Sequence, residues 1–523
     1  MSATSWANHP AMLLAIALLV ALTLERLVPR AFPALLAMLS VLGAVVLIAM
    51  IVNHIWFPFN LDLMEGVLMQ HARRAMHGEG IYPLPSPEFV PLAYNPLFYL
   101  LAAPFLILFG DTLTTLRMVA LMGMAGSAAA IFVTVRSYAR STWWATIAVG
   151  LFCTAYAAMD AYFDCAHSDG WLICCALWGT YLIGRTSRGA RIAGVIVLVA
   201  GFWFKQHGAV FLGAGLCYLT WREGARKSLV YWLIAFALGP LLYLIAPVET
   251  LGPAFHYFTW QVPSGWSELR WHSITRVAQY AKQFYLALAV IALWGTFRAI
   301  RTRSIQVLDV QLGAAFLTAF MASLDPGSTY NGFIPMGAFC IVCGSVELAR
   351  IDQRAVRFLR ARLAYVGALL AFATLLYDPR TLWLSASARE SYADLQQTIR
   401  DLPGPVYAPG IGQFVDGPRL FPAAHWIALE DMIRGRHRTH ADTARARSVL
   451  DDLRHPATTA FVLTNRPLAL IAMPVNELAA NYKMVSDFGN RFAALAPVPR
   501  PTSLGWPRYL YRFDDSGKFA HVP

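Results

Sequence analysis

Two carboxylates three positions apart, Asp62 and Glu65, lie in a polar segment between apolar stretches of the sequence. Residues 62–77 have helical periodicity, so the two side chains are expected on one face of a helix. Such a pair can act through one member as a general base, and it can also hold a divalent cation. A structural role is the alternative for Asp62, because a carboxylate near a helix start caps backbone N–H groups.

A second group of titratable residues, within 160–169, directly precedes an apolar run. Its last members include His167 and Asp169. Acids and a histidine at the mouth of a membrane helix can cap the helix, bind a cation or hold a substrate. Asp169 therefore joins Asp62 and Glu65 as a candidate ligand of Mg, Mn or Ca, and a simple helix cap is its alternative role.

A lysine between two apolar runs, Lys205, is followed by Gln206 and His207. A lysine in this position is costly in a membrane unless its ammonium reaches water or a partner. Its simplest role is structural, with the stem along apolar surface and the charged head at the interface. The segment 247–275 is rich in aromatic residues, which most simply form a belt at the membrane interface.

The composition indicates a membrane protein, because 57% of the 523 residues are hydrophobic, 14% are charged and the mean hydropathy is +0.50. A soluble domain carries roughly a quarter charged residues. We predict a mainly α, polytopic membrane helix bundle whose first segment is retained as a helix. The predicted segments are 11–28, 34–53, 95–109, 118–136, 143–160, 170–184, 190–204, 208–221, 228–246, 276–297, 306–324, 331–349 and 363–377.

The net charge of +12 comes largely from basic residues between these segments, where they orient helices rather than bind nucleic acid. The arginine-rich connections are expected in the cytoplasm; they contain Arg26, Arg30, Arg136, Arg140, Arg185, Arg188, Arg191, Arg222, Arg226, Lys227, Arg298, Arg301, Arg303, Arg350, Arg354, Arg357, Arg360 and Arg362. This alternation requires one segment not to cross, and the short 95–109 is the candidate for a re-entrant or surface position. About twelve crossings then place 54–94, 161–169, 247–275 and the tail on the outer side.

After residue 377 the composition changes, and 378–523 is predicted to form a small extracytoplasmic α/β domain. An amphipathic helix is expected over 385–401, and short strands are expected at 405–408, 460–464, 482–485 and 508–512. The seven cysteines all precede this tail, so no disulfide framework is expected there. Nothing in the tail resembles a phosphate-binding glycine motif, and we assign it no chemistry.

The acidic pair, the amphipathic helix after it, Tyr82-Pro83 and Tyr94-Asn95-Pro96 together resemble the GT-C superfamily of membrane glycosyltransferases. That family includes aminoarabinose transferases, protein O-mannosyltransferases and related bacterial enzymes. The resemblance implies that a sugar moves from a polyprenyl-phosphate donor to a glycan, lipid or protein acceptor. It also implies an inverting reaction at the periplasmic face of a bacterial inner membrane. The family often has adjacent Asp-Glu, so the spacing here leaves open whether Asp62 or Glu65 is the base.

The same resemblance implies roles for residues in the other polar segments. The candidates for binding the donor phosphate are Lys205, Gln206, Arg270 and Lys282. The candidates for binding other parts of the substrates are Tyr82, Tyr94, Asn95, His167, Asp169, His207 and His272. The 247–275 segment, with Arg270, is a candidate lid over the lipid donor. His167 stands where family members have an arginine, which weakens the transfer of a phosphate-binding role to it.

Two other functions remain open from the sequence. A secondary transporter or a flippase of a lipid-linked saccharide is the first; it would place charges near the bilayer midplane in two related halves. Here the charges gather on one side, and no symmetric halves are visible. The second is a non-catalytic envelope assembly protein, for which substitution of Asp62 or Glu65 would leave glycan formation unchanged.

Overall fold

The computed structural model describes residues 31–325, 327–353, 358–411, 423–434, 439–496 and 506–514. The first predicted apolar segment, 11–28, lies outside these residues. Every later predicted segment overlaps with helix, although the helix in 143–160 ends at Thr154, earlier than predicted. Within the described part of the chain, five helices are long and apolar enough to cross a bilayer, and shorter apolar helices pack with them. The predicted class, a mainly helical polytopic bundle with a small α/β tail, is confirmed.

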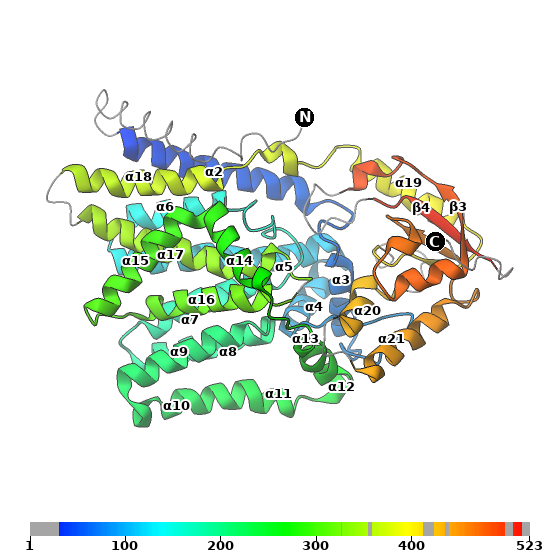
Figure 1. The fold of residues 1–523 in the computed structure, drawn as a ribbon, viewed down its shortest axis with the longest axis horizontal. Helices are drawn as coiled ribbons and strands as arrows, with labels where there is room; N and C mark the ends of the chain where they lie inside the picture. The colour runs from blue at the N-terminus through cyan, green and yellow to red at the C-terminus, as the bar shows by residue number, and fades with distance from the viewer. Residues whose placement is uncertain are drawn as a thin grey trace.

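The helices of the bundle lie alongside one another (Figure 1). They are α2 (Ala31–Ile55), α5 (Leu113–Ala139), α6 (Thr142–Thr154), α7 (Asp169–Ile183), α8 (Arg188–Phe204), α9 (Gly208–Glu223), α10 (Ala225–Phe236), α15 (Leu286–Arg301), α16 (Val307–Ser323), α17 (Ile334–Gln353) and α18 (Phe358–Leu375). Two of them are extended through π-helical turns. η1 (Ala237–Leu241) joins α10 to α11 (Leu242–Leu244), and η3 (Ala281–Tyr285) joins α14 (Trp271–Tyr280) to α15.

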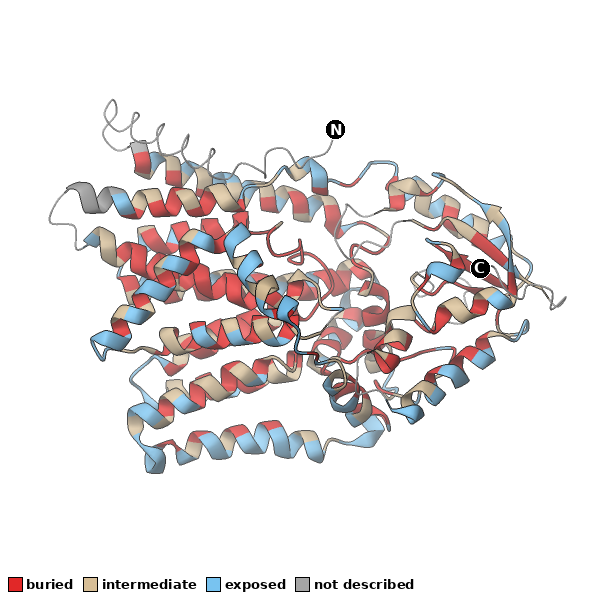
Figure 2. Cartoon of the chain, viewed as in Figure 1, coloured by how far each residue is buried: buried red, intermediate tan, exposed pale blue. Residues whose placement is uncertain are grey.

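Buried residues gather in the centre of the bundle, and exposed residues lie along its outer helices (Figure 2). Helix α17 is central: 89% of the residues in its most apolar stretch are buried, whereas only 17% of those in the corresponding stretch of α2 are buried. The exposed face of α2 is nevertheless apolar and carries Met38, Val41, Val45, Ile48 and Val52. A helix that satisfies its own backbone and exposes apolar side chains is suited to lipid contact.

Helix α4 (Leu97–Phe109) corresponds to the segment predicted not to cross. It packs against α3 (Glu65–Met76), α5 and α8. Its 13 residues extend about 20 Å, which is shorter than the roughly 30 Å hydrocarbon core. Its position beside α3, at the end of the bundle that faces the tail, agrees with that prediction (Figure 1). The non-crossing of α4 itself stays a prediction.

The tail forms a four-stranded sheet with the order β1-β2-β4-β3. Its strands are β1 (Val406–Tyr407), β2 (Phe461–Thr464), β3 (Tyr482–Asp487) and β4 (Tyr509–Phe513). Strands β1 and β2 are parallel, and the other pairs are antiparallel. Its main helices are α19 (Ala388–Arg400), α20 (Trp426–Ile433) and α21 (His440–Leu453). All four predicted strands and the predicted amphipathic helix are present.

The tail rests on the loops at one end of the bundle. The Tyr257 hydroxyl donates to Asp442 Oδ1 at 2.8 Å, and Trp266 Nε1 donates to the Asp431 carbonyl at 2.9 Å. The backbone N–H of Ala424 donates to the Pro87 carbonyl. The α9–α10 and α15–α16 connections, which have arginines in or beside them, lie at the opposite end (Figure 1).

Candidate active site

Asp62 is buried in the turn that precedes α3. The helix predicted over 62–77 begins at Glu65, so the expectation that both carboxylates share one helical face is wrong. Local hydrogen bonds hold the turn instead: Asp62 Oδ2 accepts from the Met64 N–H at 2.9 Å, and Glu65 Oε2 accepts from the Leu61 N–H at 2.6 Å. These bonds turn the two side chains toward different partners.

Asp62 begins a row of four charged side chains that extends to Lys205. The His167 imidazole lies between two carboxylates, with Nε2 3.2 Å from Asp62 Oδ2 and Nδ1 3.3 Å from Asp169 Oδ2. Asp169 Oδ1 then accepts from Lys205 Nζ at 2.8 Å. The Tyr162 hydroxyl donates to Asp62 Oδ1 at 2.8 Å. We call Asp62, His167, Asp169 and Lys205 the charge row.

Each member of the charge row comes from a place where a helix starts or stops. Asp169 is the first residue of α7, and Lys205 follows the last residue of α8. His167 lies near the end of the 155–168 loop, in which Asp160 and Ala161 have φ values of 59° and 56°. All four charged side chains are buried, and burial of a charge is unfavourable. Because the signs alternate along the row, attraction between neighbours offsets the cost of removing them from water.

Neighbouring groups fix the protonation states of Asp62 and His167 in the charge row. Burial raises the pKa of Asp62, but the hydrogen bond and positive charge of His167, with the Met64 N–H and the Tyr162 hydroxyl, outweigh it and lower the pKa to about 2. Burial lowers the pKa of His167, but hydrogen bonds to Asp169 and Asp62 raise it to about 9. At neutral pH Asp62 is therefore an anion and His167 a cation.

Glu65 belongs to a separate buried ion pair. Its partner is Arg117 on α5, with Nη2 2.6 Å from Oε2 and Nε 2.9 Å from Oε1. Glu65 also accepts from the backbone N–H groups of Leu61 and Ala166 at 2.6 and 2.8 Å. Arg117 donates in addition to the Phe57 carbonyl at 2.6 Å. The pair thus ties the 57–61 turn and the 155–168 loop to α5.

The motifs of the sequence did not single out Arg117 as a partner of Glu65. The signal was present in the sequence, since an arginine within an apolar helix requires a partner. Which carboxylate serves as that partner depends on the fold, because 52 positions separate Arg117 from Glu65.

The Tyr94 ring lies against Lys205 and His167 of the charge row. Its ring centroid lies 5.5 Å from Lys205 Nζ, and its ring meets that of His167 edge-on at 6.2 Å. Residues beside it hold the backbone in place rather than facing the row. The Tyr82 hydroxyl donates to the Tyr94 carbonyl, and Asn95 Nδ2 donates to the Phe202 carbonyl at 2.6 Å.

Gln206 and His207, predicted to contact substrate, have different surroundings. Gln206 Nε2 donates to the Ala93 and Thr259 carbonyls at 2.8 and 3.1 Å, which ties the α8–α9 break to two outer loops. His207 is half-buried directly before α9. Gln206 therefore supports the backbone around the charge row.

Three predicted residues lie apart from the charge row. Arg270 is 55% exposed at its side chain and pairs with the buried Glu268. His272 and Lys282 are exposed, on α14 and on η3. Among the described residues, no hydrogen bond or ion pair joins any of the three to the charge row. Of the four predicted phosphate ligands, Lys205 alone contacts a site carboxylate in the described structure.

The tail contributes a residue that no sequence motif marks. His425, directly before α20, is buried within electrostatic reach of Asp62 and beside the Leu63 and Gly410 backbone. Burial lowers the pKa of His425 to about 4, so its imidazole is neutral at pH 7. No motif marks such a residue, because its position depends only on how the tail docks.

The predicted metal ligands do not form a cation site as they are arranged. Asp62 and Asp169 are separated by the His167 imidazole, and Glu65 faces Arg117. Across the described ranges, no group of three or more His, Cys, Asp or Glu is placed to hold a metal ion. The donor set is already neutralised by basic side chains, so it does not fit a divalent cation.

Comparison with known proteins identifies the fold. No family model matches the sequence, and no curated protein matches it. The crystal structure of ArnT from Cupriavidus metallidurans in the apo state is similar, with a TM-score of 0.52 and 14% identity over 91% of this chain and 99% of that chain. The structure of the same protein bound to undecaprenyl phosphate gives a TM-score of 0.51 and 13% identity, over 94% and 100%. This chain therefore has the fold of the two ArnT structures.

Proposed function

We propose that this chain transfers a sugar from a polyprenyl-phosphate donor to an acceptor at the periplasmic face of a bacterial inner membrane. The observation that carries the proposal is the charge row, in which two side chains, His167 and Asp169, link the Asp62 carboxylate to the buried Lys205. A second support is the fold, since the similar ArnT structure holds undecaprenyl phosphate. The acceptor is a glycan, a lipid or a protein that presents a hydroxyl group.

In the proposed reaction Asp62 is the general base. Its carboxylate takes the proton of the acceptor hydroxyl, and the hydroxyl oxygen forms a bond to the anomeric carbon. The bond from that carbon to the phosphate oxygen breaks, and its electron pair leaves with the polyprenyl phosphate. Attack from the face opposite the phosphate inverts the anomeric centre, and the reaction uses no divalent cation.

Asp62 is preferred to Glu65 because of what holds each carboxylate. Each Glu65 oxygen accepts from Arg117 and from a backbone N–H, and Arg117 is itself fixed by backbone carbonyls. Two of the three donors to Asp62 are the side chains of Tyr162 and His167, which can turn toward a substrate. Glu65 is therefore proposed as a positioning residue.

Lys205 and His167 would stabilise the negative charge that develops on the leaving phosphate. A positive charge placed where negative charge develops stabilises the transition state strongly in a water-poor site. A phosphate bound there also competes with Asp62 for His167. Because His167 keeps the pKa of Asp62 low, donor binding would raise that pKa and make Asp62 a better base.

The proposal is tested by mass spectrometry of envelope glycans from a deletion strain that carries wild type, Asp62→Asn or Asp394→Asn. Asp394 is an exposed aspartate paired with Arg491 in the tail, so it controls for the loss of one carboxylate. Wild type and Asp394→Asn should restore one sugar mass. Asp62→Asn should lower transfer by about 10²–10⁴-fold, the usual contribution of a general base.

The membrane level of each variant is measured in the same cells. Identical glycans in all strains would contradict an enzymatic role. Movement of a lipid-linked sugar across the membrane without a covalent product would indicate a flippase instead.

A further inference from the structure

A cavity of about 210 Å³ opens at one edge of the tail sheet. Strands β1 and β2 are parallel, and the residues that follow their carboxyl ends, 409–411 and 465–466, line the cavity. Ligands of α/β proteins bind preferentially in crevices outside the carboxyl ends of parallel strands. The cavity therefore lies where this kind of sheet presents a binding site, and no role above accounts for it.

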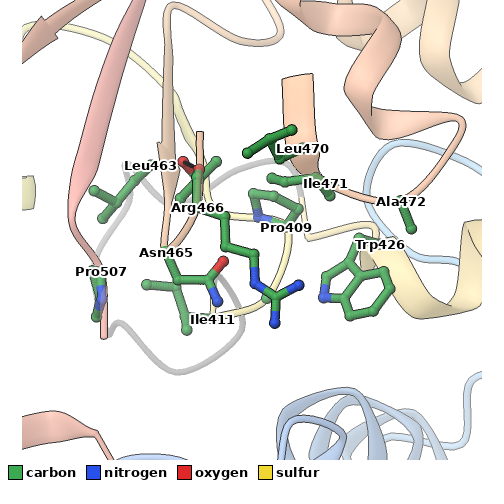
Figure 3. A pocket seen from close by; sticks show the side chains of 12 residues that line it. Pro409, Ile411, Trp426, Leu463, Asn465, Arg466, Leu470, Ile471, Ala472 and Pro507 are labelled. Atoms are coloured by element: carbon green, nitrogen blue, oxygen red, sulfur yellow. Dashed lines mark hydrogen bonds between the residues drawn. The ribbon is translucent and has the colours of Figure 1, made fainter. Parts of the chain in front are cut away.

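One charged side chain dominates the cavity. Figure 3 shows the guanidinium group of Arg466 extending into it, with the indole ring of Trp426 on the opposite wall. Within the described ranges, the Arg466 side chain makes no hydrogen bond or ion pair. Apolar side chains complete much of the wall, including those of Ile411, Leu470 and Ile471.

These lining groups select a chemical class of ligand. A guanidinium group binds carboxylate or phosphate with two parallel hydrogen bonds. An indole ring combines a broad apolar face with an N–H donor, which suits a sugar ring with its C–H face and hydroxyl edge. The volume is below the roughly 300 Å³ of drug-sized pockets, which fits a single sugar unit.

The cavity adjoins the candidate active site through a shared backbone segment. The Pro409 carbonyl accepts from the Trp426 N–H at 2.9 Å, and the Gly410 carbonyl accepts from Asn60 Nδ2 at 3.4 Å. Asn60 is two residues before Asp62, and His425 precedes Trp426. One side of the 409–411 segment thus lines the cavity, and Gly410 also faces the turn that carries the proposed base.

We propose that this cavity binds an anionic saccharide unit of the acceptor, with Arg466 on its carboxylate or phosphate and Trp426 against its ring. The identification of the ligand as part of the acceptor rests on the proposed function. Binding of the saccharide itself does not require transfer, so the two can be tested separately.

The test uses the full chain in nanodiscs and saturation-transfer NMR with glucuronate, glucose 6-phosphate and glucose. Inorganic phosphate is added as a competitor. Arg466→Ala removes the guanidinium, and Ala472→Trp fills the cavity from its wall. Arg389→Ala removes an exposed arginine on α19 that does not line the cavity and is the matched control. Asp62→Asn is included to separate binding from transfer.

Wild type, Arg389→Ala and Asp62→Asn should bind one or both anionic sugars, with glucose at least tenfold weaker. Arg466→Ala and Ala472→Trp should each weaken anionic sugar binding at least tenfold. A preference for glucuronate or for glucose 6-phosphate distinguishes a uronic acid from a sugar phosphate. Unchanged binding in both cavity variants, or equal binding of glucose, would overturn the proposal.

Inorganic phosphate provides a further discriminating result. If it displaces glucose 6-phosphate at the same concentration as glucose 6-phosphate itself, the cavity is an anion site and the saccharide proposal is wrong. If the cavity variants lose sugar binding while Asp62→Asn leaves envelope glycans unchanged, the saccharide site stands and the proposed transferase activity fails.

Discussion

At the residue scale, the candidate site pairs every buried carboxylate with a buried cation. Asp62 and Asp169 share His167, Asp169 also holds Lys205, and Glu65 holds Arg117. Isolated charges in such surroundings would cost several kcal/mol each, so the partners stabilise the ionised forms. The two groups differ in how easily a substrate could replace their contacts. Side chains make most of the contacts within the charge row, whereas backbone groups also anchor the Glu65–Arg117 pair.

The pH dependence of kcat/KM should reflect the ionisation of the His167 imidazole. Its pKa of about 9 keeps the imidazole protonated below that pH, and the proposed reaction needs this charge beside the leaving phosphate. Transfer should therefore fall as the pH rises through about 9. Asp62, with a pKa of about 2, should add no acidic limb in the free enzyme above about pH 4.

His167→Gln supplies the control for this profile, because it keeps a hydrogen-bonding side chain without a titrating proton. The variant should be slower and should lose the alkaline limb in an assay with purified protein. An alkaline limb that persists unchanged in His167→Gln would assign it to another group.

The Glu65–Arg117 pair should matter more to stability than to chemistry. Removing one partner of a buried ion pair costs about 3–5 kcal/mol, because the other charge remains buried alone. Glu65→Gln and Arg117→Met should each lower the melting temperature of the purified protein markedly. The double variant should lose less than the sum of the two.

Transfer per folded molecule decides whether Glu65 acts in the reaction. Glu65→Gln should keep this activity within about tenfold of wild type, since a positioning residue acts through its neighbours. A fall as large as that expected for Asp62→Asn would make Glu65 the base.

At the element scale, the break between α8 and α9 places Lys205 in the charge row. Helix α8 ends at Phe204 and α9 begins at Gly208, so the three intervening residues turn the chain sharply. The turn is close-packed, because a Cβ atom on Gly208 would lie 2.3 Å from the Gly201 carbonyl carbon. Glycine at this position lets the two helices approach within backbone contact.

Gly208→Ala should displace this turn and move Lys205 away from Asp169. The clash is with backbone atoms, so we expect a loss of about 1–3 kcal/mol in stability and a fall in transfer. Gly213→Ala in the same helix is the matched control, since a Cβ atom there meets nothing within 4 Å. Thermal unfolding and the glycan assay, applied to both variants, compare them. Equal behaviour of the two would show that the turn tolerates a side chain.

At the scale of the whole molecule, the tail closes the end of the bundle at which the charge row lies. Arg434 makes one of the connections between the two parts, with Nη2 3.2 Å from Asp325 Oδ2 and 2.8 Å from Asp431 Oδ1. Its guanidinium also lies 4.6 Å from the Trp266 ring. Burial raises the pKa of Asp431 to about 7, and Arg434 opposes that rise.

Arg434→Met should loosen the contact between the tail and the bundle loops. Hydrogen exchange should become faster in α20 and also in the 257–266 loop, because the shared guanidinium is lost. Arg454→Met is the matched control, since Arg454 pairs with Asp451 and Glu477 inside the tail. Faster exchange in the 257–266 loop of the control, or none in that of Arg434→Met, would contradict this account of docking.

Patterns along the chain were sufficient for the elements of this fold. Apolar runs predicted helices from 34–53 to 363–377, and the local residue pattern predicted the four short tail strands. The start of α3 was placed three residues early, because the Asp62 and Glu65 carboxylates accept hydrogen bonds from nearby backbone N–H groups in competition with helix formation. Hydropathy is a property of each segment alone, so it does not depend on the rest of the fold.

The sequence by itself determined that the chain is a membrane helix bundle with an α/β tail, and it selected Asp62, His167, Asp169 and Lys205 as residues with chemistry. Only the tertiary structure decided that these four form one row and that Glu65 pairs elsewhere. It also decided that His425 lies within electrostatic reach of Asp62, across more than 350 residues of chain. The physical reason is that local periodicity fixes which face a residue occupies, whereas the partners of a buried charge depend on which distant elements pack against that face.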